Sequence, residues 1–144
     1  MRLSTKGRYS LEIVLYICLL SSEEYANVRS VAENTGISEG YLEQLFIPLR
    51  RAGIVKSIRG SRGGYLPAKP PEQITVTEIL LAAEGSLEPA SCVAKKKPCS
   101  RKKLCFLSDL WKELHKEIIC CTDSITMADL VDAYKAMESP GYQI

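Results

Sequence analysis

The fold of this 144-residue chain is decided by two adjoining segments, VRSVAENTGIS at residues 28–38 and EGYLEQLF at residues 39–46. Gly36 supplies the positive backbone angle of a tight turn, and Ser38 can cap the helix that follows. The apolar residues that would pack the two helices together recur at helical spacing: Val28, Val31, Ala32, Leu42 and Leu45. This order predicts a helix-turn-helix, although any helical hairpin shows part of the same pattern.

The residues after this motif predict a β-hairpin. We expect Pro48 to interrupt or kink the helix and Gly53 to end a short further helix. The segment IVKSI at residues 54–58 predicts a strand, RGSRGG at 59–64 a flexible turn, and Tyr65-Leu66 the returning strand. The hairpin is then a wing. Its glycine-rich turn lies between strands rather than at the start of a helix, which disfavours a nucleotide-binding site.

Further helices are expected on both sides of this unit. The first covers about residues 8–21, where one face is apolar: Leu11, Val14, Leu15, Cys18 and Leu19. We assign Cys18 to the core. After a proline-rich connector, Thr75 and Glu78 form a capping-box signature for a helix that Gly85 ends.

The C-terminal part predicts a cysteine-bearing loop from Ser86 to Lys103 and then a long helix. One apolar stripe runs along that helix: Leu107, Leu110, Trp111, Leu114, Ile118 and Cys121. Packing on the chain's own core is one use for this stripe. A long helix after a small wing domain is also a natural dimerisation element, which would supply two-fold symmetry. A last helix is expected from about Thr126 to Met137.

The fold class that follows is mainly α with a small β-hairpin wing, a winged helix-turn-helix plus a long C-terminal dimerisation helix. A winged helix-turn-helix is typical of DNA-binding domains, so we expect residues 1–71 to form a DNA-binding domain. We expect residues 72–144 to hold the cysteine-bearing loop, as a sensor, and the dimerisation helices. The chain has 46% hydrophobic residues, which is ordinary for a globular protein. Its sequence contains no stretch that approaches the roughly 18 consecutive apolar residues that a membrane span needs. We expect a cytoplasmic protein without membrane contact, in which cysteines serve as metal ligands, redox sensors or core residues rather than in disulfides.

Charge is distributed unevenly along the chain. Residues 1–71 carry ten Lys and Arg against six Asp and Glu, whereas residues 104–144 carry three against seven. No carboxylate lies between Glu43 and Glu72, and the cations there are Arg50, Arg51, Lys56, Arg59, Arg62 and Lys69. This local excess suits binding to phosphates, although a solvated basic face would show the same composition.

Three segments resemble the IscR, NsrR and CymR type of winged-helix bacterial regulators: MRLSTKGRY at residues 1–9, YLEQL at 41–45, and Arg59-Gly60 followed by Gly63-Gly64-Tyr65. The resemblance implies a homodimer on double-stranded DNA, with residues 38–45, beginning at Ser38, in the major groove and the Arg59-Gly60 wing turn in the minor groove. Tyr41, Glu43 and Gln44 would touch bases or nearby phosphates, and Thr5 and Lys6 would hold the backbone. Glu accepts from cytosine, Gln reads adenine, and a narrow minor groove attracts Arg. Tyr41 could equally pack between helices.

Cys92, Cys99 and Cys105 have six and then five residues between them, in a region rich in lysine and arginine. Nearby cations favour the thiolates that ligate iron. Cluster-binding members of the family carry three cysteines here, which implies an iron-sulfur cluster, with 2Fe-2S favoured over 4Fe-4S. Zinc is the lesser choice because no Cys-x-x-Cys pair is present.

The fourth ligand stays open. Ser108 stands where IscR-like proteins have a histidine, and Arg8 where NsrR-like ones can have an acid. Glu12, Asp109, Cys120, Cys121, a small molecule or solvent are candidates, while His115 is expected to be an exposed side chain of the long helix.

The sequence therefore predicts a transcription regulator, most simply a repressor, whose affinity for its operator responds to an iron-sulfur cluster. The alternative is a cluster-free regulator of the CymR type, controlled by thiol chemistry or by docking of a metabolic enzyme. An enzyme such as a thiol oxidoreductase is disfavoured, because Cys-x-x-Cys is absent and His115 has no evident nucleophile partner.

Overall fold

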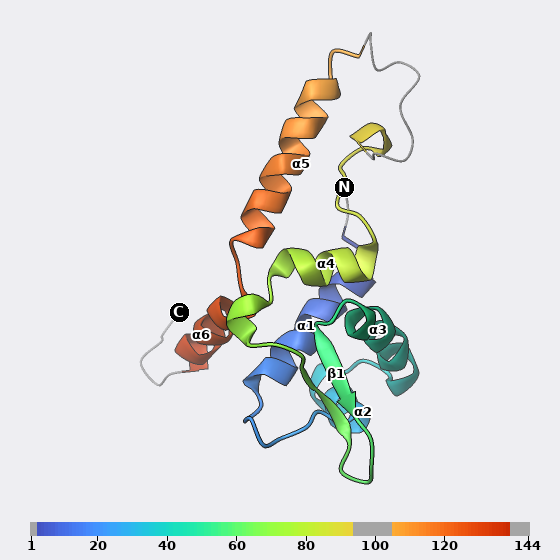
Figure 1. The fold of residues 1–144 in the computed structure, drawn as a ribbon, viewed down its shortest axis with the longest axis vertical. Coiled ribbons are helices and arrows are strands. Elements are labelled where there is room, and N and C mark those ends of the chain that lie inside the picture. Colours follow the sequence, from blue (N-terminus) through green and yellow to red (C-terminus); the bar gives the residue numbers. More distant parts are fainter. Residues whose placement is uncertain (1–2, 94–104, 139–144) are drawn as a thin grey trace.

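The structure, a computed structural model, describes residues 3–93 and 105–138 (Figure 1). Along the chain, the helices and strands are α1 (Thr5–Leu19), α2 (Val28–Thr35), α3 (Glu39–Arg51), β1 (Val55–Ile58), β2 (Gly64–Pro67), η1 (Pro71–Gln73), α4 (Val76–Glu84), η2 (Ser91–Val93), α5 (Ser108–Asp123) and α6 (Met127–Glu138). The predicted fold class, mainly α with a two-stranded wing, is confirmed. None of the helices within the described ranges has the length and apolar character needed to cross a bilayer.

The helix-turn-helix forms where the sequence predicts it. The Asn27 side chain caps α2 by accepting from the Ser30 N–H at 2.8 Å, and Gly36 ends α2 with φ +73°. A residue with a Cβ rarely adopts that backbone angle, so glycine fits this turn. Ser38 occupies the residue before α3, but its side chain makes no capping hydrogen bond.

The expectation that Pro48 separates two helices is wrong, since α3 runs from Glu39 through Pro48 to Arg51. A proline inside a helix removes one backbone hydrogen bond and crowds the carbonyl four residues earlier. Phe46 and Leu49 on either side of Pro48 are almost completely buried. Their packing outweighs the local cost of the proline, and the turn at Gly53, with φ +72°, follows only after Ala52.

Helix α1 begins earlier and ends earlier than the predicted range of 8–21. Ser4 caps it by accepting from the Lys6 N–H at 3.2 Å, and Leu20 is already extended. Its fully buried side chains are Ser10, Ile13, Val14 and Ile17, while Leu11, Leu15 and Cys18 pack at the margin of the core. The buried face differs from the predicted one because α1 is covered by α2, α3, α4, α6 and β2 rather than by one neighbour.

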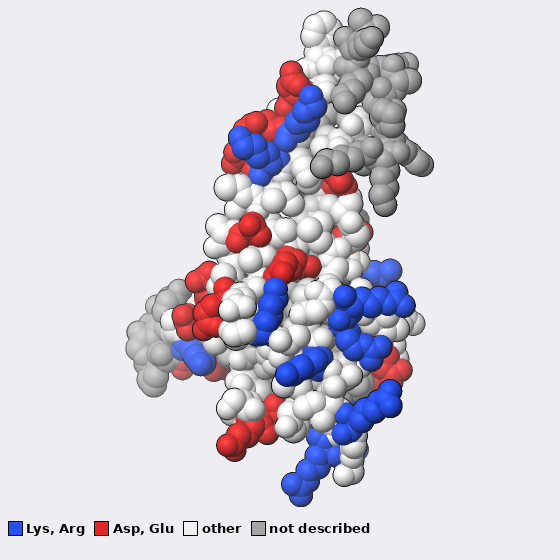
Figure 2. Space-filling model, in the orientation of Figure 1, with Lys and Arg blue, Asp and Glu red and all other residues white. Residues whose placement is uncertain are grey.

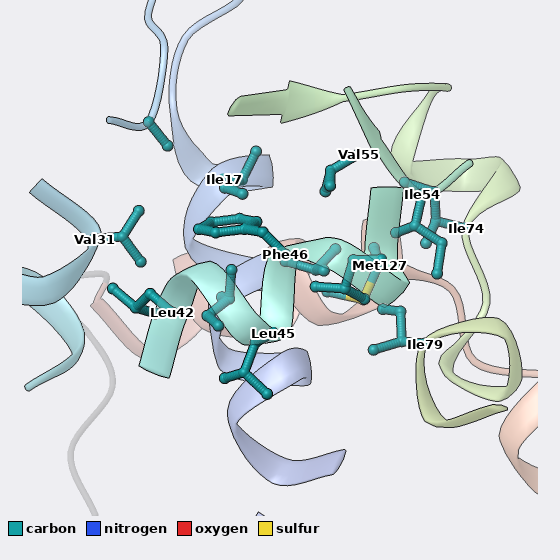
Figure 3. Packing of buried hydrophobic residues seen from close by; sticks show 14 of the residues in the cluster. Ile17, Val31, Leu42, Leu45, Phe46, Ile54, Val55, Ile74, Ile79 and Met127 are labelled. Atoms are coloured by element: carbon teal, nitrogen blue, oxygen red, sulfur yellow. The ribbon is translucent and has the colours of Figure 1, made fainter. Parts of the chain in front are cut away.

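The wing is joined directly to α3 and to the segment before α2. Strands β1 and β2 pair antiparallel, and Tyr65 also exchanges two backbone hydrogen bonds with Ala26, of 2.8 and 2.9 Å. The Tyr65 ring stacks on Phe46 with ring centroids 3.7 Å apart. Figure 3 shows Phe46 among buried side chains that come from α1, α2, α3, β1, α4 and α6. These contacts fix the wing relative to α3.

The C-terminal elements return to the same core. Thr75 and Glu78 form the predicted capping box of α4, and Gly85 ends α4 with φ +80°. The start of α6 is held by the Met127 N–H, which donates to the Ile74 carbonyl at 2.8 Å. Because Ile74, Ile79 and Met127 belong to the core cluster that contains Phe46, helices α4 and α6 are integral to the body of the protein.

Helix α5 is attached mainly through its C-terminal half and projects from the body (Figure 1). Ile118 and Ile119 pack on a small cluster of Val76, Leu80 and Leu87, and the Thr77 and Thr122 hydroxyls lie 2.5 Å apart. The predicted single stripe is divided. Trp111 and Ile118 are half-buried, whereas Leu107, Leu110 and Leu114 are 50%, 54% and 41% exposed. No residue of α5 is fully buried.

Candidate nucleic-acid interface

Helix α3 presents one face to the core and the other to solvent. Leu42, Leu45 and Phe46 are buried, and the alternate positions are exposed, among them the predicted DNA contacts Ser38, Glu43 and Gln44. The buried face holds the helix in place, so the polar side chains are presented on a rigid element. Such a helix can carry base-reading groups into a major groove.

Tyr41 serves in packing, although it is not fully buried. Its ring lies edge-on to Tyr9, with centroids 6.0 Å apart and an angle of 77° between the ring planes. An edge-to-face pair of this kind stabilises the contact between α1 and α3. The remaining exposed part of Tyr41 lines a surface cleft, so packing and contact with a ligand are compatible at this residue.

Two adjoining clefts bring the N-terminal and α3 candidates together. The first, of about 290 Å³, is lined by Lys6, Tyr41, Gln44, Leu45, Pro48, Ala82 and Ala83. The second, of about 400 Å³, is lined by Ser4, Thr5, Lys6, Tyr41, Ala83 and Glu84. The predicted backbone contacts of α1 therefore lie beside the predicted base contacts of α3, with the end of α4 forming the opposite wall.

The wing exposes Arg59, Gly60 and Arg62 at its turn. Gly60 has φ +123°, and its carbonyl accepts from the Gly63 N–H at 3.0 Å to close the turn. Since only glycine readily adopts that backbone angle, the turn can stay narrow and present Arg59 and Arg62 outward.

The exposed cations of the first part of α1, the end of α3 and the wing have no ion-pair partner within the described residues. They form the basic face, which consists of Lys6, Arg8, Arg50, Arg51, Lys56, Arg59 and Arg62, all exposed. The ion pairs in the described ranges are Arg29–Glu33, Lys69–Glu78, Lys112–Asp109 and Lys116–Glu113. Figure 2 shows Lys and Arg gathered over α3 and the wing, and Asp and Glu over α6. Unpaired cations on one face are suited to neutralising phosphates.

The predicted cluster ligands lie only partly within the described residues. Cys92 lies in η2 and Cys105 just before α5, and both are half-buried. Cys99 lies outside the described residues. Helix η2 packs against α5, so Cys92 is close to the helix that Cys105 precedes. No group of three His, Cys, Asp or Glu side chains that could hold a metal occurs among the residues described. The predicted set includes Cys99, so it stays a prediction.

The other sulfur and imidazole groups differ in their surroundings. Burial, and to a lesser degree the charge of Glu72, raises the pKa of the Cys18 thiol to about 11, which fits its predicted core role. Cys120 and Cys121 are exposed on α5. The expectation of an exposed His115 is wrong, because its ring is half-buried with Nδ1 3.3 Å from the Leu87 carbonyl.

Glu84, the last residue of α4, also belongs to this site. Its carboxylate contacts the first turn of α1, which carries Thr5 and Lys6. Since the two segments are 77 to 80 residues apart in sequence, no local pattern indicates this contact.

Comparison with known proteins shows consistent similarity along the chain. A family model described as Rrf2, iron-dependent transcriptional regulator, matches residues 3–133. The HTH-type transcriptional regulator CymR of Bacillus subtilis is 37% identical over 99% of this chain and 97% of its own length. IscR of Photorhabdus laumondii is 36% identical over 99% of this chain and 87% of its own length. A solved structure of CymR, described as the global cysteine regulator of B. subtilis, matches with a TM-score of 0.75 and 36% identity, over 92% of this chain and 98% of that chain.

Proposed function

Because this chain belongs to the Rrf2 family of transcriptional regulators, we propose that it is a cytoplasmic repressor that binds operator DNA as a homodimer. Its relatives are regulators of transcription and not enzymes. The observation that carries the proposal is the basic face, since its exposed cations surround the solvent side of α3 and continue into the wing. Residues 1–71 supply this face, and residues 72–144 supply the sensor and the dimer contact.

In this complex, the exposed side of α3 enters the major groove. Glu43 accepts a hydrogen bond from cytosine, Gln44 pairs with adenine, and Ser38 lies at the helix N-terminus, which suits a phosphate. Arg59 enters the minor groove beside Gly60, whose missing side chain allows close approach. Thr5 and Lys6 hold the backbone, and Tyr41 contacts DNA with the part of its ring that Tyr9 leaves free.

The dimer contact is the exposed apolar side of α5. Leu107, Leu110, Leu114 and Cys121 recur at intervals of three, four and seven residues, the spacing of a helix-helix seam. All four are exposed in the single chain, and the opposite side of α5 already packs on the body. A second copy that covers this seam would supply a second α3 for the other half of a two-fold symmetric operator.

For the signal, we propose an iron-sulfur cluster held by Cys92, Cys99 and Cys105. Three thiolates near many lysines and arginines suit iron, and the half-buried positions of Cys92 and Cys105 beside α5 favour retention of a cluster. A 2Fe-2S cluster is favoured. When bound, such a group supplies sensitivity to oxidants or to iron supply, and the chain passes this signal to the dimer helix.

A second candidate is thiol or partner control of the CymR type. The identity to CymR is 37% over nearly the whole chain, about the same as the 36% identity to IscR, so both types are candidates. Ser108 and Arg8 at the positions of the familiar fourth ligands favour this second candidate. In this candidate, the same DNA-binding face is kept and the cysteine-bearing loop is a regulatory surface.

DNA recognition is tested by measuring affinity and sequence selection with Glu43→Ala and Arg59→Ala. We expect Glu43→Ala to relax the preferred sequence, and Arg59→Ala to weaken binding about tenfold, as loss of a good base contact does. Unchanged affinity and selectivity in both variants would contradict the groove assignment.

The cofactor is tested by visible absorption, iron and sulfide analysis of protein purified without oxygen, with Cys92→Ala for comparison. A brown protein that contains iron and sulfide, and that loses its colour in Cys92→Ala, would support the cluster. A colourless protein that cannot be reconstituted would favour thiol or partner control.

A further inference from the structure

The first turn of α1 is held by a carboxylate from another helix. Glu84 Oε1 accepts from the Ser4 N–H at 2.9 Å, from the Ser4 hydroxyl at 2.7 Å and from the Gly7 N–H at 3.1 Å. The Ser4 oxygen in turn accepts from the Lys6 N–H. One carboxylate oxygen at the end of α4 therefore fixes the backbone on both sides of Thr5 and Lys6.

Gly7 makes this approach sterically feasible. A Cβ added at Gly7 would lie 2.5 Å from Glu84 Oε1 and 3.3 Å from Leu80 Cδ2, and the former is closer than real Cβ contacts allow. Gly7 is buried even though glycine is unfavourable inside a helix. The close contact with Glu84 is a reason for glycine at this position.

The negative charge of Glu84 also stabilises the N-terminal end of α1. The N-terminal end of a helix carries partial positive charge, so cations there are unfavourable and anions are favourable. The first turn of α1 has no acidic residue, and it carries exposed Lys6 followed by Arg8. Glu84 supplies the missing negative charge from α4. An arrangement that breaks a local rule and is corrected from elsewhere is typical of a functional site.

We propose that Glu84 is a positioning residue for DNA binding. It holds the turn Ser4–Gly7 so that Thr5 and Lys6 present their side chains toward the phosphate backbone beside α3. This inference rests on the proposed function, because it assigns a role within the same DNA-binding surface. It adds a residue that would touch no DNA and acts through Ser4 and Gly7.

Glu84 also lies close in sequence to the proposed regulatory region. Gly85 alone separates it from the loop that begins at Ser86 and contains Cys92.

The test measures binding of the full-length protein to labelled duplex DNA of random sequence at several salt concentrations. Glu84→Ala is compared with Glu72→Ala, which removes the same charge from an exposed position. We expect Glu84→Ala to bind about tenfold more weakly and to lower the salt slope by about 1.8, the value for one lost phosphate contact in each protomer of the dimer. Glu72→Ala should keep the wild-type slope.

Two further variants show whether Glu84 acts through the α1 turn. In a Lys6→Ala background, Glu84→Ala should cause little additional loss, because both changes remove the same contact. Glu84→Gln keeps an oxygen that can accept from Ser4 and Gly7 but loses the negative charge, so its affinity should lie between those of the wild type and Glu84→Ala. Far-UV circular dichroism confirms that each variant is folded.

The opposite results separate the two proposals. If wild type binds DNA and Glu84→Ala matches Glu72→Ala in affinity and salt slope, the positioning role is overturned and the proposed function stands. Fully additive losses with Lys6→Ala, or Glu84→Gln as weak as Glu84→Ala, would overturn it as well. Wild-type protein without affinity for any duplex would overturn the proposed function itself.

Discussion

The basic face and helix α5 both expose side chains that a folded protein usually neutralises or buries, and they do so in opposite ways. The basic face carries seven exposed cations without an ion-pair partner in the described residues. On α5, Lys112 and Lys116 are paired with Asp109 and Glu113, whereas Leu107, Leu110 and Leu114 are left exposed. The basic face therefore has charge without a partner in the described residues, and α5 has apolar area that is exposed to solvent.

The difference indicates two unlike partners. Unpaired cations gain most from a polyanion, because phosphates bring dense negative charge and release counterions. Exposed leucines at seam spacing gain most from a second apolar surface, where burial contributes roughly 25 cal/mol per Å². The two surfaces also differ in how they are attached to the protein. Helix α3 packs on the large buried core, whereas α5 packs on a small cluster near its C-terminal end.

The largest expected effect tests the core that supports the basic face. Phe46 is 1% exposed and stacks on Tyr65 of the wing, so Phe46→Ala should lower the free energy of unfolding by about 3–5 kcal/mol. Its neighbour Ile47 is 42% exposed, and Ile47→Ala should cost about 1 kcal/mol or less. Urea denaturation measures both, and equal losses would show that burial at Phe46 does not stabilise the body.

The next effect concerns the apolar surface of α5. Leu110→Lys combined with Leu114→Lys should produce a monomer whose DNA affinity is at least about a hundredfold lower, because the gain from linking two half-sites is lost. Light scattering gives the mass, and fluorescence anisotropy gives the affinity. Met137→Lys alters a residue that is 60% exposed on α6 and should leave both unchanged. A double variant that remains dimeric would place the interface elsewhere.

A smaller effect on DNA affinity is expected when an unpaired cation of the basic face is removed and compared with a paired cation of α5. Arg62→Ala should weaken DNA binding by up to about tenfold and lower the salt slope by about 1.8, because one unpaired wing cation of each protomer meets a phosphate. Lys116 is paired on α5, and Lys116→Ala should change DNA affinity by less than about 0.5 kcal/mol. Equal losses at the two positions would contradict the division between the two surfaces.

The smallest effect lies on the buried side of α1, the helix whose first turn carries Lys6 of the basic face. Ser10 is fully buried, and its hydroxyl has no hydrogen-bond partner among the described residues. Ser10→Ala should leave stability unchanged or raise it by up to about 1 kcal/mol, since it removes an unsatisfied polar group. Thermal denaturation beside Ser57→Ala, an exposed position on β1, measures the change. A clear loss of stability would mean that the Ser10 hydroxyl has a partner.

Several features could be predicted from neighbouring residues. The turn at Gly36, the wing, the capping box of Thr75 and Glu78, and the end of α4 at Gly85 all lie where the sequence places them. Pro48 is one of the local signals that failed. Its helix-breaking tendency is overcome by the burial of Phe46 and Leu49, which no local rule can weigh.

The sequence names candidate residues for the site but does not predict how they are arranged. Exposure of Ser38, Glu43, Gln44 and Arg59 agrees with their proposed roles, although the roles themselves stay predictions. The clefts show in addition that Thr5 and Lys6 lie beside Tyr41 and Gln44. The half-buried His115 was not foreseen, since its partner Leu87 is 28 residues away.

The sequence by itself determined the order of helices and strands, the wing and the resemblance to a regulator family, because turns, caps and periodicity depend on residues a few positions apart. Only the tertiary structure decided which apolar side of α5 is covered, and that Glu84 holds the first turn of α1. Periodicity shows which side chains share a face, but not which neighbour covers that face. That choice depends on packing between distant segments, where many small contacts compete at once.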